Sequence, residues 1–166
     1  MQINKLLTTL VLTVLSSVAM SQQKEDRQFK LGLGGALAIP ANNLNQTSIG
    51  GGLDILGLYK LSDAVQLSAD AGFTVLAGKG VFSSTAVIPV RAGIRILPGS
   101  AFYLTGKLGV GIFTILKESE TYFAYAAGAG YQLNKRFDLG VSYDGYSKND
   151  ISFGLVAIRL GYSFGK

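Results

Sequence analysis

The most regular pattern in the chain lies between Val65 and Val75, where apolar and polar positions alternate strictly. Odd positions carry Val, Leu, Ala or Phe, and even positions up to Thr74 carry polar residues or Gly. A repeat of two is typical of a β-strand with one apolar and one polar face. The stretch from Val65 to Ala77 is long enough to cross a membrane as a tilted strand, which needs about 9–11 residues.

Segments of the same kind recur along the chain without any helical spacing between them. They are Phe29–Ile39, Ile49–Lys60, Val65–Ala77, Thr85–Ile96, Phe102–Phe113, Thr121–Leu133, Arg136–Gly145 and Ile151–Phe164. Pro89 removes one backbone donor from the fourth segment, but the alternation continues on both sides of it, which favours a strand. We therefore expect eight strands.

The connections between these segments are predicted to alternate in length. Short turns are expected at Ser62-Asp63, Leu97–Ser100 and Asn134-Lys135, and longer loops at Pro40–Ser48, Gly78–Ser84, Thr114–Glu120 and Ser147–Asp150. Short periplasmic turns and longer outer loops are typical of outer-membrane barrels. An even number of strands places both ends of the barrel domain on the periplasmic side.

Side-chain size predicts which face points outward. One face carries nearly all the Leu, Ile, Val and Phe. The other carries small residues together with Lys30, Asp54, Asp70, Arg91, Arg95, Lys107, Asp138 and Arg159. A small barrel has little interior room, so the large aliphatic residues suit lipid better than the lumen. Aromatic residues near strand ends are expected to form interfacial girdles, namely Phe29, Tyr59, Phe102, Phe113, Phe137, Tyr143, Tyr162 and Phe164. A secreted, soluble, lipocalin-like binding barrel is the alternative.

Two stretches, Ile88–Gly93 and the ending Arg159–Phe164, resemble the small outer-membrane β-barrel family of Gram-negative bacteria, the OmpA/OmpX-like and PorT-like group. The resemblance implies an all-β, eight-stranded, antiparallel up-and-down transmembrane β-barrel in the cell outer membrane. It also implies two partners: the lipid of that membrane, and the barrel assembly machinery, which would read Tyr162 and Phe164. Gly165-Lys166 follow the final aromatic residue and depart from the strict family pattern.

The N-terminus has the features of a secretory signal peptide. Lys5 is followed by an apolar stretch, Leu6–Met20, and by the small residues around Ser21. We expect a signal peptide over residues 1–21, a polar lead-in over 22–28 and the barrel over 29–166. A retained transmembrane anchor is the alternative, but the apolar stretch is shorter than the roughly 20 residues that a helical span needs.

Composition limits the chemistry that the chain can perform. Cys, His and Trp are absent, so there is no disulfide, no thiolate metal site and no histidine base. The net charge of +5 is spread along the chain and forms no nucleic-acid footprint. Barrel enzymes of the lipid A acyl-modifying and omptin protease kinds rely on His. We therefore expect no enzyme, no metal site, no cofactor and no nucleic-acid partner.

The inward charges are the candidate site. If the hairpin of the third and fourth strands is centred on the Gly78–Ser84 loop, Asp70 lies opposite Arg91. If the hairpin of the seventh and eighth strands is centred on Lys148-Asn149, Asp138 lies opposite Arg159. We expect a structural network of lumen charges, made of Asp70, Arg91, Arg95, Lys107, Asp138 and Arg159. A narrow polar path or a small-ligand site is the alternative interpretation of the same residues.

The predicted function is a structural or interaction role in the outer membrane. Eight-stranded barrels usually have an interior just filled by side chains, so no open pore is expected. The alternative is a narrow channel or an accessory subunit of an envelope transport or secretion complex. A partner protein in the envelope stays unidentified, although Asn42, Asn43 and Asn45 are candidates for contacting one.

Overall fold

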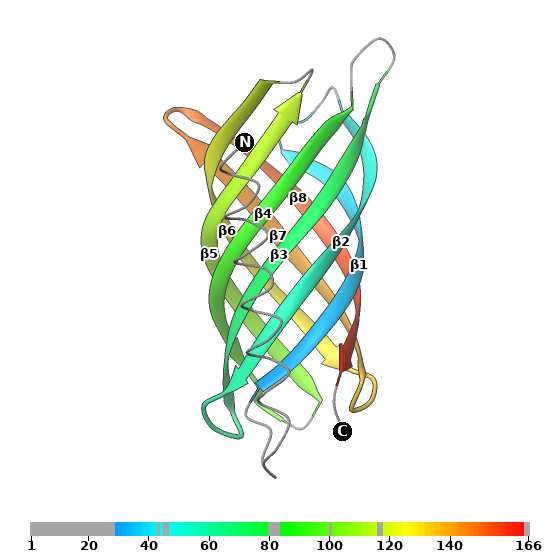
Figure 1. Cartoon of the computed structure of the whole chain (residues 1–166), viewed down its shortest axis with the longest axis vertical. Helices are drawn as coiled ribbons and strands as arrows, with labels where there is room; N and C mark the ends of the chain where they lie inside the picture. Colours follow the sequence, from blue (N-terminus) through cyan, green and yellow to red (C-terminus); the bar gives the residue numbers. More distant parts are fainter. Residues whose placement is uncertain are drawn as a thin grey trace, which may run out of the picture.

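The computed structural model describes residues 29–42, 44, 47–79, 84–99, 101–115 and 118–164. These residues form eight antiparallel strands that close into one barrel (Figure 1). The strands are β1 (Phe29–Asn42), β2 (Thr47–Lys60), β3 (Val65–Gly78), β4 (Thr85–Ile96), β5 (Phe102–Ile115), β6 (Glu118–Gln132), β7 (Phe137–Lys148) and β8 (Ile151–Phe164). The predicted eight-stranded up-and-down barrel is confirmed, while the predicted signal peptide and lead-in lie outside the described residues.

Each strand pairs with its neighbour in the chain, and β8 pairs with β1 to close the barrel. We call the end at which β1 begins and β8 ends the base, and the opposite end the rim. The turns after β2, β4 and β6 lie at the base, and the connections after β1, β3, β5 and β7 lie at the rim (Figure 1). Within the described residues, no helix is long and apolar enough to cross a membrane.

The outer surface of the barrel is apolar on every strand. Leu53 is 74% exposed, Leu108 61% and Phe73 51%. A soluble barrel would place such side chains in its lumen, so the lipocalin-like alternative is wrong. Lipid is the environment that suits this belt, and the closed ring of strands pairs the backbone groups that lipid cannot satisfy.

The predicted alternation of long and short connections is wrong, because the strands continue into the segments expected as rim loops. Thr114 pairs with Ser119 inside the predicted Thr114–Glu120 loop. Lys148 pairs with Ile151, leaving only residues 149–150 between β7 and β8. The two connections 116–117 and 149–150 are therefore shorter than the turn at 61–64. The polar residues at these strand ends lie beyond the apolar belt. Their polarity therefore reflects exposure of the strand ends to water and does not indicate a loop.

Pro89 lies inside β4, as expected, without ending the strand. It is opposite Gly111 on the β5 side. On the β3 side the register is the same above and below it, with Ala71 opposite Val90 and Thr74 opposite Val87. The missing donor therefore interrupts the pairing locally and leaves the barrel register intact.

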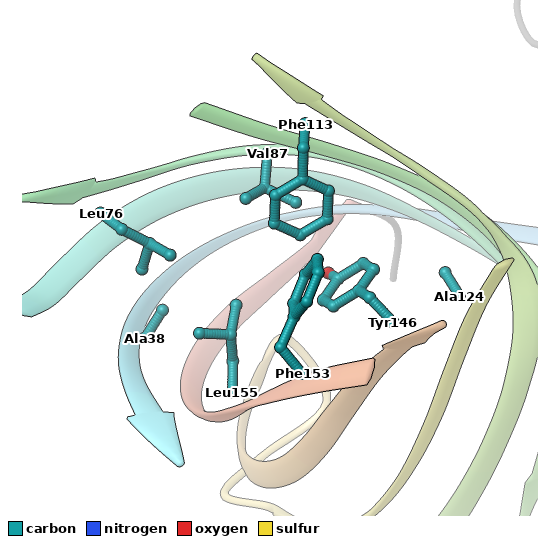
Figure 2. Packing of buried hydrophobic residues seen from close by; sticks show 8 residues of the cluster. All are labelled: Ala38, Leu76, Val87, Phe113, Ala124, Tyr146, Phe153 and Leu155. Carbon is teal, nitrogen blue, oxygen red and sulfur yellow. The ribbon is translucent and has the colours of Figure 1, made fainter. Parts of the chain in front are cut away.

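The lumen near the rim holds an apolar cluster rather than polar residues. Its buried members are Ala38, Leu76, Val87, Phe113, Ala124, Tyr146, Phe153 and Leu155 (Figure 2). Tyr122 and Leu44 are partly buried and pack against this cluster. Phe113 was expected in the outward aromatic girdle, but it is only 6% exposed and points inward. The reason is strand parity, because the odd positions of β5, including Tyr103, face the lumen.

Candidate functional site in the barrel lumen

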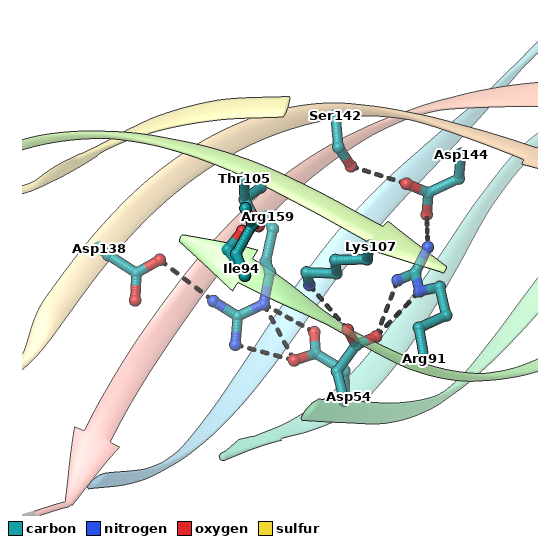
Figure 3. A network of polar contacts seen from close by, with 10 residues as sticks. Asp54, Arg91, Ile94, Thr105, Lys107, Asp138, Ser142, Asp144 and Arg159 are labelled. Carbon is teal, nitrogen blue, oxygen red and sulfur yellow. Dashed lines mark hydrogen bonds and ion pairs between the residues drawn. The ribbon is translucent and has the colours of Figure 1, made fainter. Parts of the chain in front are cut away.

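The charged residues of the lumen contact one another in a network of ion pairs and hydrogen bonds (Figure 3). They lie on the base side of the apolar cluster, as the positions of these residues along the strands show. Asp70 of β3 lies opposite Arg91 of β4, which is the expected register. The Nε and Nη2 atoms of Arg91 donate to Asp70 Oδ2 at 3.1 and 2.9 Å. Both side chains are at least nine-tenths buried, so each relieves the other of an otherwise costly buried charge.

Lys107 of β5 also reaches Asp70, although one strand lies between them. The Lys107 ammonium is 2.8 Å from Asp70 Oδ1. The residue opposite Lys107 on the intervening strand β4 is Gly93, which has no side chain to obstruct that reach. Asp70 is therefore shared by two cations.

Arg91 joins the two sides of the barrel. Its Nη1 atom is 2.9 Å from Asp144 Oδ2 on β7, and Ser142 donates a hydrogen bond of 2.9 Å to the other oxygen of that carboxylate. Asp144 was not among the predicted site residues. Its inward parity on the seventh segment was the available signal, but pairing across the lumen cannot be deduced from strand neighbours.

Arg159 of β8 holds two carboxylates. Its Nε and Nη2 atoms donate to Asp54 of β2 at 2.8–2.9 Å, and its Nη1 atom donates to Asp138 of β7 at 3.2 Å. The contact with Asp54 crosses β1, where Gly34 leaves room that a Cβ would fill. Sequence reasoning placed Asp54 in the lumen but did not assign it to the site.

The predicted register of β7 and β8 is wrong by two residues. Asp138 lies opposite Gly161, and Arg159 lies opposite Gly140. The turn is centred on residues 149–150, with Asn149 at a φ of 52°, instead of on Lys148-Asn149. A shift of the turn centre by one residue moves the register by two, and the long Arg159 side chain still reaches Asp138 diagonally.

Arg95 is the predicted site residue that the structure keeps apart from the ion pairs. Its guanidinium carbon lies 3.8 Å from the centroid of the Tyr103 ring, and Tyr103 donates a 2.8 Å hydrogen bond to Asp138. Arg95 is only 3% exposed, and no carboxylate among the described residues lies within ion-pair distance of it. The other five predicted residues are joined by ion pairs, together with Asp54 and Asp144.

The described residues line three small cavities at successive depths in the lumen. Their volumes are about 70, 40 and 20 Å³ in order from the apolar cluster to the base. Since one water needs roughly 10–15 Å³ by this measure, they have room for about five, three and one waters. The described residues include no group of three or more Asp or Glu side chains that could hold a metal ion.

Aromatic side chains pack against one another on the rim side of this charged region. Phe113 lies edge-to-face with Phe153 at 4.6 Å and with Tyr146 at 4.8 Å, and Tyr122 lies 4.9 Å from Phe153. These four residues come from four consecutive strands, β5 to β8, and we call them the aromatic plug. The inward face was expected to carry small residues and charges, so sequence reasoning missed the plug. Its signal was the inward parity of Phe113.

Comparison with known proteins supports the architecture. Among solved structures, the chain is similar to the Ail attachment invasion locus protein of Yersinia pestis, with 20% identity, a TM-score of 0.58, and coverage of 82% of this chain and 97% of that one. It is also similar to the N-terminal β-barrel domain of Pseudomonas aeruginosa OprF, with 17% identity, a TM-score of 0.61, and 81% and 97% coverage. Neisserial surface protein A gives 15% identity, a TM-score of 0.55, and 82% and 97% coverage.

Sequence comparison with curated proteins gives no significant match. The family described as outer membrane protein beta-barrel domain matches residues 8–164, which is nearly the whole chain. These residues include the closed barrel, its apolar belt and its charged lumen. The protein therefore belongs to the outer membrane protein beta-barrel domain family and lies in the outer membrane.

Proposed function

We propose that this barrel has a structural or interaction role in the outer membrane, with a lumen filled by side chains and no open pore. The observation that carries the proposal is the aromatic plug above a charge-paired interior. Ions would have to cross both regions to pass through the barrel. The proposal includes no catalytic activity, in keeping with a sequence that has no His or Cys.

The plug supports closure at the rim because its members contact one another across the lumen. Tyr146 is 1% exposed and Phe113 6%, and the rings pack in edge-to-face contacts that aromatic side chains favour. Leu76 and Val87, each fully buried, extend the same cluster to β3 and β4. Apolar side chains therefore occupy the lumen from several sides.

The charged middle supports the same function. Asp54, Asp70, Asp138 and Asp144 face the four cations Arg91, Arg95, Lys107 and Arg159. Equal numbers of opposite charges leave this set neutral, and the ion pairs join β2, β3, β4, β5, β7 and β8. We expect these contacts to hold the barrel in one shape.

A narrow channel is the second candidate, and the three cavities are the observation that favours it. They follow one another toward the base and are lined largely by polar side chains, including Lys107 and Asp144 between the two larger ones. A channel would still need the plug to open. An accessory role in an envelope transport or secretion complex fits the same fold and is separated by capture of envelope partners after crosslinking.

Conductance in planar bilayers tests the closed lumen. The full-length protein should show no large, stable openings. The double variant Phe113→Ala with Phe153→Ala removes two rings of the plug, and if the plug closes the lumen it should show more frequent openings. Large stable openings of the unaltered protein would contradict the proposal.

Besides the membrane lipid, we propose the barrel assembly machinery as a partner, which would recognise Tyr162 and Phe164. Their rings are 5.1 Å apart on β8, and Tyr162 also lies 5.1 Å from Phe137. The supporting point is position, because β8 is the strand that closes the barrel against β1. Phe164→Ala should lower the folded, heat-modifiable fraction in membranes more than Leu160→Ala, an outward change on the same strand. Equal folded fractions would contradict this assignment.

A further inference from the structure

Arg95 differs from the other inward cations near it. Arg91, Lys107 and Arg159 each lie within 3.2 Å of a carboxylate. Arg95 is only 3% exposed, and its Nε atom has no hydrogen-bond partner among the described residues. The Tyr103 ring stabilises the Arg95 charge through a cation–π contact, but no carboxylate among the described residues pairs with it, so the Nε–H of this buried guanidinium remains available to an acceptor.

The surroundings of Arg95 are basic and open toward the base. The cavity of about 20 Å³ below it is lined by Arg95, Gln66, Asp138 and three exposed cations, Lys30, Lys135 and Arg136. Its single lining carboxylate, Asp138, already accepts hydrogen bonds from Tyr103 and Arg159. Four positive charges therefore face one negative charge that is already occupied.

A second unpartnered polar atom lies at the same place. Gln66 is opposite Arg95 in the register of β3 and β4, and its Oε1 atom is buried without a hydrogen-bond partner. The Gln66 Oε1 acceptor needs a donor such as water, whereas the Arg95 Nε–H donor needs an acceptor, and only this donor can be satisfied by an anion. The excess of positive charge favours an anion.

We propose that the base of the barrel binds a phosphate group through Arg95. The cavity has room for about one water-sized atom, so one phosphate oxygen enters it and accepts from the Arg95 guanidinium. The remaining oxygens stay in the open mouth, within the field of Lys30, Lys135 and Arg136. Guanidinium suits phosphate because its fixed N–H groups match the oxygens. The proposal does not depend on whether the lumen conducts.

Inorganic phosphate is the probe, titrated calorimetrically into the full chain in octyl glucoside, a detergent without phosphate, at constant ionic strength set with chloride. Arg95→Gln should weaken phosphate binding about tenfold or more, which is the contribution expected of a hydrogen bond to a charged group. The matched control is Lys79→Gln, which removes one exposed positive charge at the rim and should leave the affinity unchanged.

Resistance to unfolding provides a second measurement, which separates a loss of phosphate binding from a loss of folding. Without phosphate, Arg95→Gln should be about as resistant to unfolding as the unaltered chain, because loss of the cation–π contact with Tyr103 is offset by removal of a buried charge that no described carboxylate pairs. With phosphate, the unfolding midpoint should rise for the unaltered chain and Lys79→Gln but not for Arg95→Gln. Absence of phosphate binding, or equal binding by all three proteins, would overturn the proposal.

Reconstitution distinguishes a free anion from a lipid headgroup as the source of the phosphate. In phosphatidylcholine vesicles, a midpoint shift with inorganic phosphate that matches the shift in detergent supports the free anion. Loss of the shift in vesicles, with the shift retained in detergent, supports a lipid headgroup that already occupies Arg95. Both outcomes support a phosphate site at the base.

Discussion

The aromatic plug and the charged network occupy adjacent parts of the same lumen and are held together by different interactions. The plug is built from rings such as Phe113 and Phe153 in edge-to-face contact. The network is built from ion pairs such as Asp70–Arg91. Removing a ring leaves a gap, whereas removing one charge leaves another charge without a partner. A substitution in the plug therefore costs packing free energy, whereas a substitution in the network costs the free energy of an unpaired buried charge.

Position explains this difference. The plug lies at the rim, where the lumen approaches water and where apolar burial gains from the exclusion of that water. The network lies deeper, at the level of the apolar outer belt, where buried charges must find partners inside the barrel. The comparison predicts that network variants respond to the presence of a partner and plug variants to the volume that is lost.

The largest effect is expected from Asp70→Ala. Lys107 loses the carboxylate that it contacts at 2.8 Å, and Arg91 loses one of its two. Removing one member of a buried pair costs about 3–5 kcal/mol, so the free energy of unfolding should fall by that amount. The measurement is a urea titration of the folded barrel in micelles, followed by the heat-dependent shift on gels.

The matched control is Ser68→Ala, two residues away on the same strand and the same face. Ser68 is buried, but its hydroxyl has no hydrogen-bond partner, so its removal should change stability by well under about 1 kcal/mol. Equal unfolding midpoints for the two variants would remove the Asp70 pairing from the explanation.

The second effect in size is expected from Phe153→Ala in the plug. Loss of a buried ring costs about 3 kcal/mol, the lower end of the usual range, because the rim lets water or neighbouring rings enter the gap. The control is Phe123→Ala on the outer face, where Phe123 is 53% exposed to lipid. If Phe123→Ala lowers the unfolding midpoint as much as Phe153→Ala, the plug does not contribute through burial.

Part of this organisation is predictable from the sequence. Alternation identifies all eight strands, and side-chain size identifies their lipid face. The register of Asp70 with Arg91 follows from centring one hairpin on its loop. The same reasoning gives the wrong register at Asp138, because the left-handed conformation of Asn149 moves the turn by one residue. Register is thus only as accurate as the turn assignment.

The remaining features depend on contacts between strands that are not neighbours. Asp54 reaches Arg159 across β1, and Asp144 reaches Arg91 across the lumen. Pairing of adjacent strands gives no information on either contact. The plug was missed for a different reason, since polar strand ends at the rim were interpreted as loops and Phe113 was assigned to the outward aromatic girdle.

A smaller effect is expected from Tyr103→Phe, at the boundary between the network and the base. The variant loses the 2.8 Å hydrogen bond to Asp138 but keeps the ring on which Arg95 stacks. The free energy of unfolding should fall by about 1.5 kcal/mol, which is typical of a hydrogen bond to a charged group. Tyr143→Phe, an outward change, is the control and should be nearly neutral in the same titration. If Tyr103→Phe lowered the free energy of unfolding more than Phe153→Ala does, Tyr103 would have a larger role than this hydrogen bond.

The smallest effect is expected from Asp63→Asn, in the exposed turn between β2 and β3. Lys60 lies 2.6 Å from Asp63 and holds the pKa of this carboxyl below its ordinary value of 3.8. A lowered folded-state pKa adds stability above the unfolded-state value, and this stability is lost as the pH falls through the folded-state pKa. The unaltered chain should therefore exceed Asp63→Asn slightly at pH 7, and the two should converge on acidification below the folded-state pKa. Water and salt screen this pair, so the difference should also shrink at high salt. If Asp63→Asn lowered the free energy of unfolding as much as Asp70→Ala does, burial would not be the reason that the network pairs are strong.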